Sequence, residues 1–254
     1  PFETERERLE QWFGEGGGRH LGYLDLARLL DPRQVMAEAR SALVGFFPYA
    51  RPEAVPGARP GALKLSRYLW GEDYHCLLKA RLKRLLAEAQ DRWPGLQGRA
   101  CVDTAPLMER ALAVRAGLGW RGKHTLLITG KGGSWGLLGV LLLDAELEPD
   151  RPFAGEHCGT CTCCIEACPS GALSLFRLDP NLCISTYTIE TEAEPPEAVR
   201  QAMARTGWVA GCDACQEACP WNLAPLWGDP ELWGGSSFLH ESPVERLSMG
   251  SARW

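Results

Sequence analysis

Helices are predicted in the first half of the chain from hydrophobic periodicity and from residues typical of helix ends. A polar segment rich in Glu and Arg at 3–13 predicts a surface helix, which the glycines at 16–18 end. Residues 31–40 predict a second helix, and Pro106 opens another that runs to Ala116. The clearest helix spans 78–89, where these apolar positions lie three or four apart: Leu78, Leu82, Leu85, Leu86 and Ala89.

Continuous apolar runs between these helices predict buried strands. Residues 42–47 and 99–102 form two such runs. Residues 125–129 and 135–143 form two more, and the glycine-rich turn between them is typical of a hairpin. Helices that alternate with strands and lead into a hairpin indicate an α+β core over residues 20–150.

Length and hydropathy limit what surrounds this core. A chain of 254 residues with 45% hydrophobic content can bury one sizeable core and a small second unit. Three prolines predict a long loop at 49–63, of the kind that often lies over a binding site. The longest apolar run, at 135–143, is too short to span a bilayer, and no secretory segment opens the chain. We therefore expect a cytoplasmic protein without a membrane contact.

Charge leaves the question of nucleic-acid binding open. The formal net charge of −5 argues against binding over the whole surface, which needs many cations to neutralise phosphates. The predicted helix at 78–89 nevertheless carries one basic face, made of Lys79, Arg81, Lys83 and Arg84. This face is either an ordinary solvated surface or a contact for nucleic-acid phosphates.

The cysteines carry the strongest chemical signal. Nine of the eleven fall within 158–219, and a C-x2-C-x2-C-x3-C-P run places four of them as in bacterial ferredoxins: Cys158, Cys161, Cys164 and Cys168. In that run the fourth thiolate ligates a second cluster, so a second set of ligands is expected. A shorter C-x2-C-x3-C-P run supplies Cys212, Cys215 and Cys219, and Cys183 can complete it.

The crossover rule then divides eight thiolates between two [4Fe-4S] clusters. Cluster 1 takes Cys158, Cys161, Cys164 and Cys219, and cluster 2 takes Cys168, Cys183, Cys212 and Cys215. Structural zinc and disulfides are the competing interpretations, but zinc favours paired C-x2-C knuckles and a reducing compartment disfavours disulfides. Cys163, next to a ligand, is left over as a bystander.

Two clusters side by side can pass electrons to an acceptor that the sequence must also hold. No glycine-rich segment follows a strand and opens a helix, so a dinucleotide cofactor is unsupported. A ferredoxin-like protein that only carries electrons is one alternative. The large domain ahead of the cysteines argues for an enzyme instead.

Several segments outside the cysteines resemble the epoxyqueuosine reductase family. They are residues 66–75, 102–110, 116–128, 133–135 and 183–190, and the similarity runs from about residue 20 to about residue 240. The resemblance implies a cobalamin-dependent reductase that removes the epoxide oxygen of epoxyqueuosine in a tRNA anticodon loop. It also implies a cobalamin-binding core like that of nitroreductases and reductive dehalogenases at 1–150 and a ferredoxin-like module at 151–230. The family's helical-repeat tail is not seen in the C-terminal segment, 231–254.

The same resemblance assigns a proton donor to the aspartate of the segment Val-Asp-Thr-Ala-Pro, which is Asp103. Opening an epoxide leaves a developing alkoxide, so an acid beside the cofactor is chemically required. A helix N-cap is the alternative role of this aspartate. We expect His75 to be packed rather than to ligate cobalt.

Further cofactor contacts are predicted with less specific signals. Lys123 and His124 follow glycines and precede a strand. One interpretation is that they contact the amides of the corrin or its nucleotide phosphate, and the other is that they form a surface turn. Arg67 and Tyr68 follow the proline-rich loop and either contact cofactor or substrate or have no role there. An external donor such as flavodoxin or ferredoxin and a monomeric state are expected. A reductive dehalogenase acting on a small molecule remains the enzymatic alternative.

Overall fold

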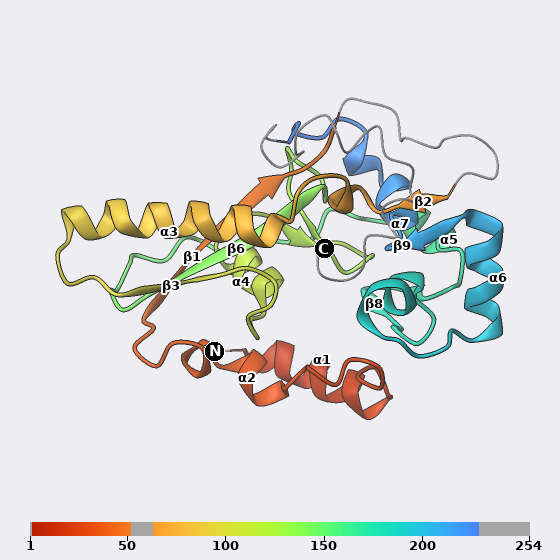
Figure 1. The fold of residues 1–254 in the computed structure, drawn as a ribbon, viewed down its shortest axis with the longest axis horizontal. Coiled ribbons are helices and arrows are strands. Elements are labelled where there is room, and N and C mark those ends of the chain that lie inside the picture. Colours follow the sequence, from red (N-terminus) through yellow and green to blue (C-terminus); the bar gives the residue numbers. More distant parts are fainter. Residues whose placement is uncertain (1, 52–62, 229–254) are drawn as a thin grey trace.

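A three-stranded antiparallel sheet forms the centre of the first half of the chain. The computed structural model describes residues 2–51 and 63–228 (Figure 1), so most of the predicted loop at 49–63 and the segment 231–254 lie outside it. The strands are β1 (Ser41–Pro48), β6 (Gly136–Leu143) and β3 (Gly98–Cys101), in the order β1-β6-β3. Because β6 is the middle strand, its C-terminal half is fully buried.

Helices cover this sheet with two separate apolar clusters. Helix α3 (Tyr74–Arg92) presents its buried Leu78 and Leu82 to Leu141 and Leu143 of β6. Helix α4 (Glu109–Arg115) belongs to the other cluster, in which Val44, Val140 and Leu142 are among the buried residues. The alternation of β6 side chains between two clusters follows from the two-residue period of a strand. The predicted α+β class is confirmed, as are β1, β3 and the long helix.

The N-terminal helices only partly follow the prediction. Helix α1 (Glu3–Gly14) confirms the expected surface helix. The helix predicted at 31–40 is wrong: α2 (Leu26–Leu30) precedes it, and only a 3₁₀ turn, η1 (Pro32–Gln34), follows. The Asp25 carboxylate caps α2, and Asp31 then adopts an extended backbone ahead of Pro32, which has no N–H to continue the helix.

Helix α4 also begins later than predicted. Residues 103–107 form tight turns instead of a first helical turn, with the Thr104 N–H donating to the Val102 carbonyl and the Leu107 N–H to the Ala105 carbonyl. The helix begins only at Glu109. The prediction of a helix from Pro106 is therefore wrong at its start, and Asp103 lies in the turns that precede the helix.

The predicted hairpin between 125–129 and 135–143 is wrong as well. Strand β5 (Leu127–Ile128) pairs with β4 (Trp120–Arg121), whereas β6 pairs with β1 and β3. The tight turn is the one at 122–126, where the Gly122 N–H donates to the Leu126 carbonyl and the Thr125 N–H to the Gly122 carbonyl. Beyond β5, only an isolated bridge between Thr129 and Gly133 precedes β6.

The cysteine-rich part is built from short elements. They are α5 (Cys163–Glu166), β7 (Leu173–Ser174), β8 (Arg177–Leu178), the π-helix η3 (Thr186–Glu190), α6 (Glu197–Thr206), β9 (Trp208–Ala210), α7 (Ala214–Glu217) and η4 (Pro220–Asn222). Helices α5 and α7 each carry cysteines and pack against each other. No helix within the described ranges is long and apolar enough to cross a membrane.

One parallel strand pair joins this part to the first half of the chain. Strand β2 (Lys64–Leu65) pairs with β9, and β2 leads directly into the 3₁₀ helix η2 (Arg67–Trp70). The Ser66 N–H extends the ladder by donating to the Ala210 carbonyl. Residues just before the cysteine loop at 212–219 are thereby fixed beside Arg67 and Tyr68.

Candidate functional site

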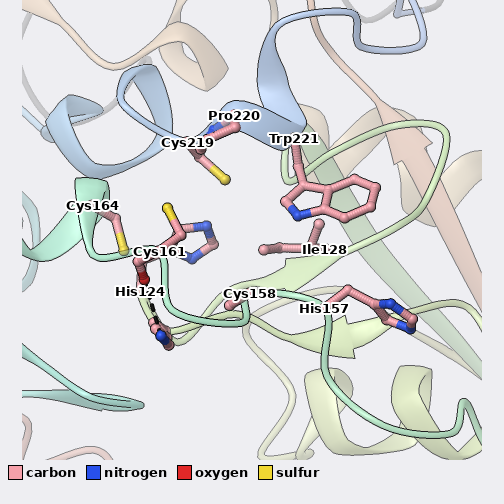
Figure 2. A pocket seen from close by; sticks show the side chains of 10 residues that line it. His124, Ile128, His157, Cys158, Cys161, Cys164, Cys219, Pro220 and Trp221 are labelled. Atoms are coloured by element: carbon pink, nitrogen blue, oxygen red, sulfur yellow. Dashed lines mark hydrogen bonds between the residues drawn. The ribbon is translucent and has the colours of Figure 1, made fainter.

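Four cysteines from two distant segments face one cavity. Cys158, Cys161 and Cys164 come from the loop that enters α5, and Cys219 follows α7. They line a cavity of about 130 Å³ together with Lys123, His124, Ile128, His157, Pro220 and Trp221. Figure 2 shows the sulfurs of Cys161, Cys164 and Cys219 turned toward this space. Burial raises the pKa of Cys219 to about 11, and the negative charges of the other three thiolates add to the shift.

The remaining predicted ligands form a second group. Burial raises the pKa of Cys212 to about 12, and Cys183 and Cys168 add to the shift as negative neighbours. The pKa of Cys215 is raised well above its usual value by burial and then by Cys212, Asp213, Cys183 and Cys168. Most of the thiols that act on one another thus fall into the two groups that the crossover rule predicts. The exception is Cys163, which interacts with Cys161 of the first group.

Both groups suit an iron-sulfur cluster. All eleven cysteines are free thiols, so the disulfide interpretation is wrong for this structure. Buried thiols that raise one another's pKa are stabilised as thiolates when they bind a cation. Four thiols around a space, as at cluster 1, match the four corners of a cubane. Among the residues with a described placement, no three His, Cys, Asp or Glu side chains converge as ligands of a single ion.

Cys163 is more exposed to solvent than the eight predicted ligands. It is solvent-exposed, whereas its neighbour Cys164 is buried on the cavity wall. The helical backbone of α5 turns consecutive side chains in different directions, which explains the difference. Its assignment as a bystander stays a prediction, and an exposed thiol next to a ligand offers a matched control for cysteine substitutions.

Lys123 and His124 lie on the wall of the cluster 1 cavity. They occupy the turn between β4 and β5 and are only 6% and 3% exposed, so the surface-turn alternative is wrong. The Lys123 ammonium donates to the carbonyl oxygens of Gly159 (2.5 Å) and Cys161 (3.0 Å) and thereby holds the cysteine loop. Burial lowers the pKa of His124 to about 4.

Asp103 has a strained backbone conformation and an exposed side chain. Its φ is +47°, in the left-handed region that favours glycine, and its side chain is 64% exposed. Such strain in a residue other than glycine is found most often at functional sites. Because α4 starts at Glu109 without a side-chain cap, the N-cap alternative for Asp103 is wrong.

His75 contacts two carboxylates in this region. Its Nδ1 lies 2.7 Å from Asp73 Oδ1, and its Nε2 lies 3.3 Å from Asp103 Oδ2. The ring also stacks on Tyr74, with 4.0 Å between ring centroids. His75 is therefore more than a packed helix residue, and it bridges α3 to the Asp103 turn.

Three tyrosines surround the same turn. Burial, followed by nearby negative charges that include Asp103, raises the pKa values of Tyr23, Tyr68 and Tyr74. The Tyr23 hydroxyl donates to Glu190 at 2.7 Å, and Tyr68 meets Tyr74 edge to face. Tyrosine hydroxyls are protonated at neutral pH in any case, and the raised pKa values extend this state to more alkaline pH.

Glu109 is hydrogen-bonded to the backbone of Asp103 and was missed by the sequence analysis. Its Oε1 accepts a hydrogen bond of 2.9 Å from the Asp103 N–H. Burial raises the pKa of Glu109 to about 7, and the charge of Asp103 adds to the shift. The only signal in the sequence was an acidic residue six positions downstream, which does not reveal a hydrogen bond across an irregular turn.

The raised pKa of Glu109 predicts a loss of stability with rising pH. The folded carboxyl keeps its proton up to about pH 7, whereas the unfolded carboxyl loses it near its ordinary value, so the folded state binds more protons in between. The free energy of unfolding should therefore fall by about 3 kcal/mol between pH 4.5 and pH 8 through this group. Anaerobic denaturant unfolding of the wild type and Glu109→Gln measures the difference. Equal pH dependence in both proteins would contradict this assignment.

Arg67 links the tyrosines to the second thiol group. Its guanidinium lies over the Trp135 ring, 4.6 Å from the centroid, and forms an ion pair of 3.5 Å with Glu217. Its backbone N–H donates to the buried Asp213 carboxylate at 2.7 Å. Within the described structure, Arg67 Nε is buried and has no hydrogen-bond partner. A buried donor without a partner suits a bound group with acceptor oxygens, such as the amides of a corrin.

Two family models match the chain. "Epoxyqueuosine reductase QueG, DUF1730" matches residues 30–104, which end at the Asp103 turn. "4Fe-4S double cluster binding domain" matches residues 157–222, which contain both thiol groups.

Comparisons over most of this chain agree with these models. An epoxyqueuosine reductase of Synechocystis is 42% identical over 85% of this chain and 74% of its own length. That of Cyclobacterium marinum is 39% identical over 87% of this chain and 71% of its own. The solved structure from Streptococcus thermophilus superimposes with a TM-score of 0.77 and 28% identity over 91% of this chain, which spans 63% of that protein. This chain therefore belongs to the epoxyqueuosine reductase family.

Proposed function

We propose that this chain reduces the epoxide of epoxyqueuosine in tRNA to give queuosine, with cobalamin and two [4Fe-4S] clusters. Relatives of this name match most of the chain, and one solved relative, 29% identical with a TM-score of 0.73, holds a tRNA stem loop that carries epoxyqueuosine. The observation that carries the proposal is the pairing of eight thiols in two groups with an open carboxylate, Asp103, in one chain.

The thiol groups supply the route for electrons. Cys158, Cys161, Cys164 and Cys219 hold cluster 1. Cys168, Cys183, Cys212 and Cys215 hold cluster 2. An external one-electron donor such as flavodoxin or ferredoxin feeds them. Cobalamin, when bound, would supply the strongly reducing metal centre that epoxide reduction needs. Arg67, with its unpartnered Nε, and Tyr68 hold the cofactor from the side of the second group.

Asp103 delivers the proton that the opened epoxide needs. His75 Nδ1 is close enough to Asp73 to donate its hydrogen there, so its Nε2 carries no hydrogen when the ring is neutral. Asp103 Oδ2 and Nε2, 3.3 Å apart, then attract each other only if a proton lies between them. A proton between Asp103 Oδ2 and His75 Nε2 is therefore in place for transfer to the opened epoxide.

The turn that carries Asp103 is able to move. One solved relative, from Bacillus subtilis, shows its catalytic aspartate loop swung out of the active site. In this chain the strained φ of Asp103 and the hydrogen bond from its N–H to Glu109 fix the conformation of the turn. Glu109 is accordingly a positioning residue.

The substrate and domain organisation complete the proposal. Lys79, Lys83 and Arg84 are exposed on α3, the helix that also carries His75, and they contact tRNA phosphates. The core at 1–150 is related to that of nitroreductases and reductive dehalogenases, the cluster module spans 151–230, and the protein acts as a monomer.

An anaerobic turnover assay tests the function. Protein reconstituted with iron, sulfide and cobalamin is given reduced flavodoxin and tRNA that contains epoxyqueuosine, and the digested nucleosides are analysed by mass spectrometry. We expect the modified nucleoside to lose one oxygen atom. Reduction of a halogenated compound without any change in the tRNA would favour the dehalogenase alternative. Reduced clusters without either reaction would favour a simple electron carrier.

A further inference from the structure

The His124 ring lies on the wall of the cluster 1 cavity, and its hydrogen bond to Leu126 determines which of its nitrogens carries the proton. The backbone N–H of Leu126 donates to His124 Nδ1 at 3.2 Å, so Nδ1 is the acceptor. A neutral imidazole then carries its hydrogen on Nε2. Within the described residues, Nε2 is buried and has no hydrogen-bond partner. An N–H that is removed from water and left unpaired destabilises the folded protein, so a partner is expected in the complete protein.

The local backbone holds this ring in place. The turn between β4 and β5 is closed by hydrogen bonds of 2.8 Å from Gly122 to Leu126 and from Thr125 to Gly122. A side chain at Gly122 would approach the His124 Cε1 atom to 2.9 Å, so glycine leaves the room that the ring needs. The ring lines the same cavity as Cys158, Cys161, Cys164 and Cys219, and Figure 2 shows it among these side chains.

We propose that His124 Nε2–H donates a hydrogen bond to a sulfur atom of the cluster held by Cys158, Cys161, Cys164 and Cys219, and that this bond raises the reduction potential of that cluster. A hydrogen bond to a cluster sulfur stabilises the extra negative charge of the reduced state. The inference rests on the proposed cluster at these cysteines. His124 is then a positioning residue, because it affects electron transfer only through the cluster.

The second thiol group has different polar surroundings. Asp213, beside Cys212 and Cys215, accepts hydrogen bonds from the Arg67 N–H, the Ser66 hydroxyl and the Gln216 amide. An acceptor does not stabilise added negative charge in the way that a donor does. Donors also reach this group, since Ser185 and the backbone of Thr186 donate to Cys183 and the backbone of Ala214 donates to Cys212. The inference therefore concerns the potential of cluster 1 alone.

Redox titration of the reconstituted holoprotein, followed by electron paramagnetic resonance, tests the inference. In His124→Leu we expect the midpoint potential of one cluster to become more negative while that of the other is unchanged. In His124→Gln, whose amide can donate to sulfur, most of the shift should be restored. Full iron and sulfide content in each variant establishes that both clusters are present. Unchanged potentials in a fully loaded His124→Leu protein would overturn the inference.

A second measurement needs no substitution. Wild-type protein labelled with ¹⁵N in the imidazole ring, with cluster 1 reduced, should show hyperfine coupling to one histidine nitrogen in pulsed spectra. Absence of this coupling overturns the inference even if His124→Leu fails to fold. A wild-type protein that binds no iron would instead refute the proposed clusters, and with them the function. Clusters and turnover without the coupling would refute the role of His124 alone.

Discussion

Asp103→Asn is expected to lower the rate of epoxide reduction by a factor of about 10²–10⁴, the range typical of a lost general acid. The amide keeps the size of the side chain but does not supply the proton that lies between Asp103 and His75. Because Asp103 is 64% exposed and lies outside both thiol groups, the variant should retain both clusters and bind cobalamin normally. Single-turnover measurement on modified tRNA, with iron analysis and the visible spectrum of bound cobalamin, separates these effects.

Asp91→Asn provides the matched control for this prediction. Asp91 is an exposed aspartate near the end of α3, away from the Asp103 turn in sequence, and it should keep wild-type turnover. If Asp103→Asn turned over modified tRNA at the rate of this control, the assignment of the acid would be wrong. The assignment of the clusters would remain, since it depends on other residues.

Cys183→Ala is expected to remove one cluster and leave the other. Cys183 lies outside both cysteine runs, yet it is half-buried and sits within electrostatic reach of Cys168, Cys212 and Cys215. Without it cluster 2 has three thiolate ligands, so the iron and sulfide bound after reconstitution should fall by about half. Turnover should be lost with the cluster, because the route for electrons is interrupted.

Cys163→Ala is the control for a cysteine that is not a ligand. Its thiol is exposed, and the variant should bind as much iron as the wild type and keep its activity. A similar loss of iron in both variants would mean that the crossover assignment is incomplete. Loss of iron in Cys163→Ala alone would exchange the roles of the two residues.

The cysteine groups were predictable because their spacing encodes local geometry. A run of ligands three and four residues apart can reach one cubane only through a narrow set of loop shapes, and the crossover to the second run is part of the ferredoxin pattern. Helix α3 was predictable for a similar reason, since its periodic leucines must face one side. Both features depend on residues that are close together in the sequence.

Features that depend on distant residues were not predictable. The apolar run at 135–143 pairs with β1 and β3, about 90 and 40 residues away, and not with its neighbour β5. Glu109 and Asp213 have raised pKa values, to about 7 and about 6, because folding buries them. Nothing in their local sequence distinguishes them from solvated acids. The start of α4 was misassigned because a proline usually marks a helix start.

The short parallel ladder between β2 and β9 has a mechanical consequence. Pairing of Lys64 with Trp208 and of Leu65 with Ala210 is continued by the bond from the Arg67 N–H to Asp213, one residue beyond Cys212. This pairing therefore holds Tyr68, beside the proposed cofactor site, and Cys212, a proposed ligand of cluster 2, close together through the backbone. A movement that opens the protein to an anticodon loop must therefore have its hinge elsewhere in the chain.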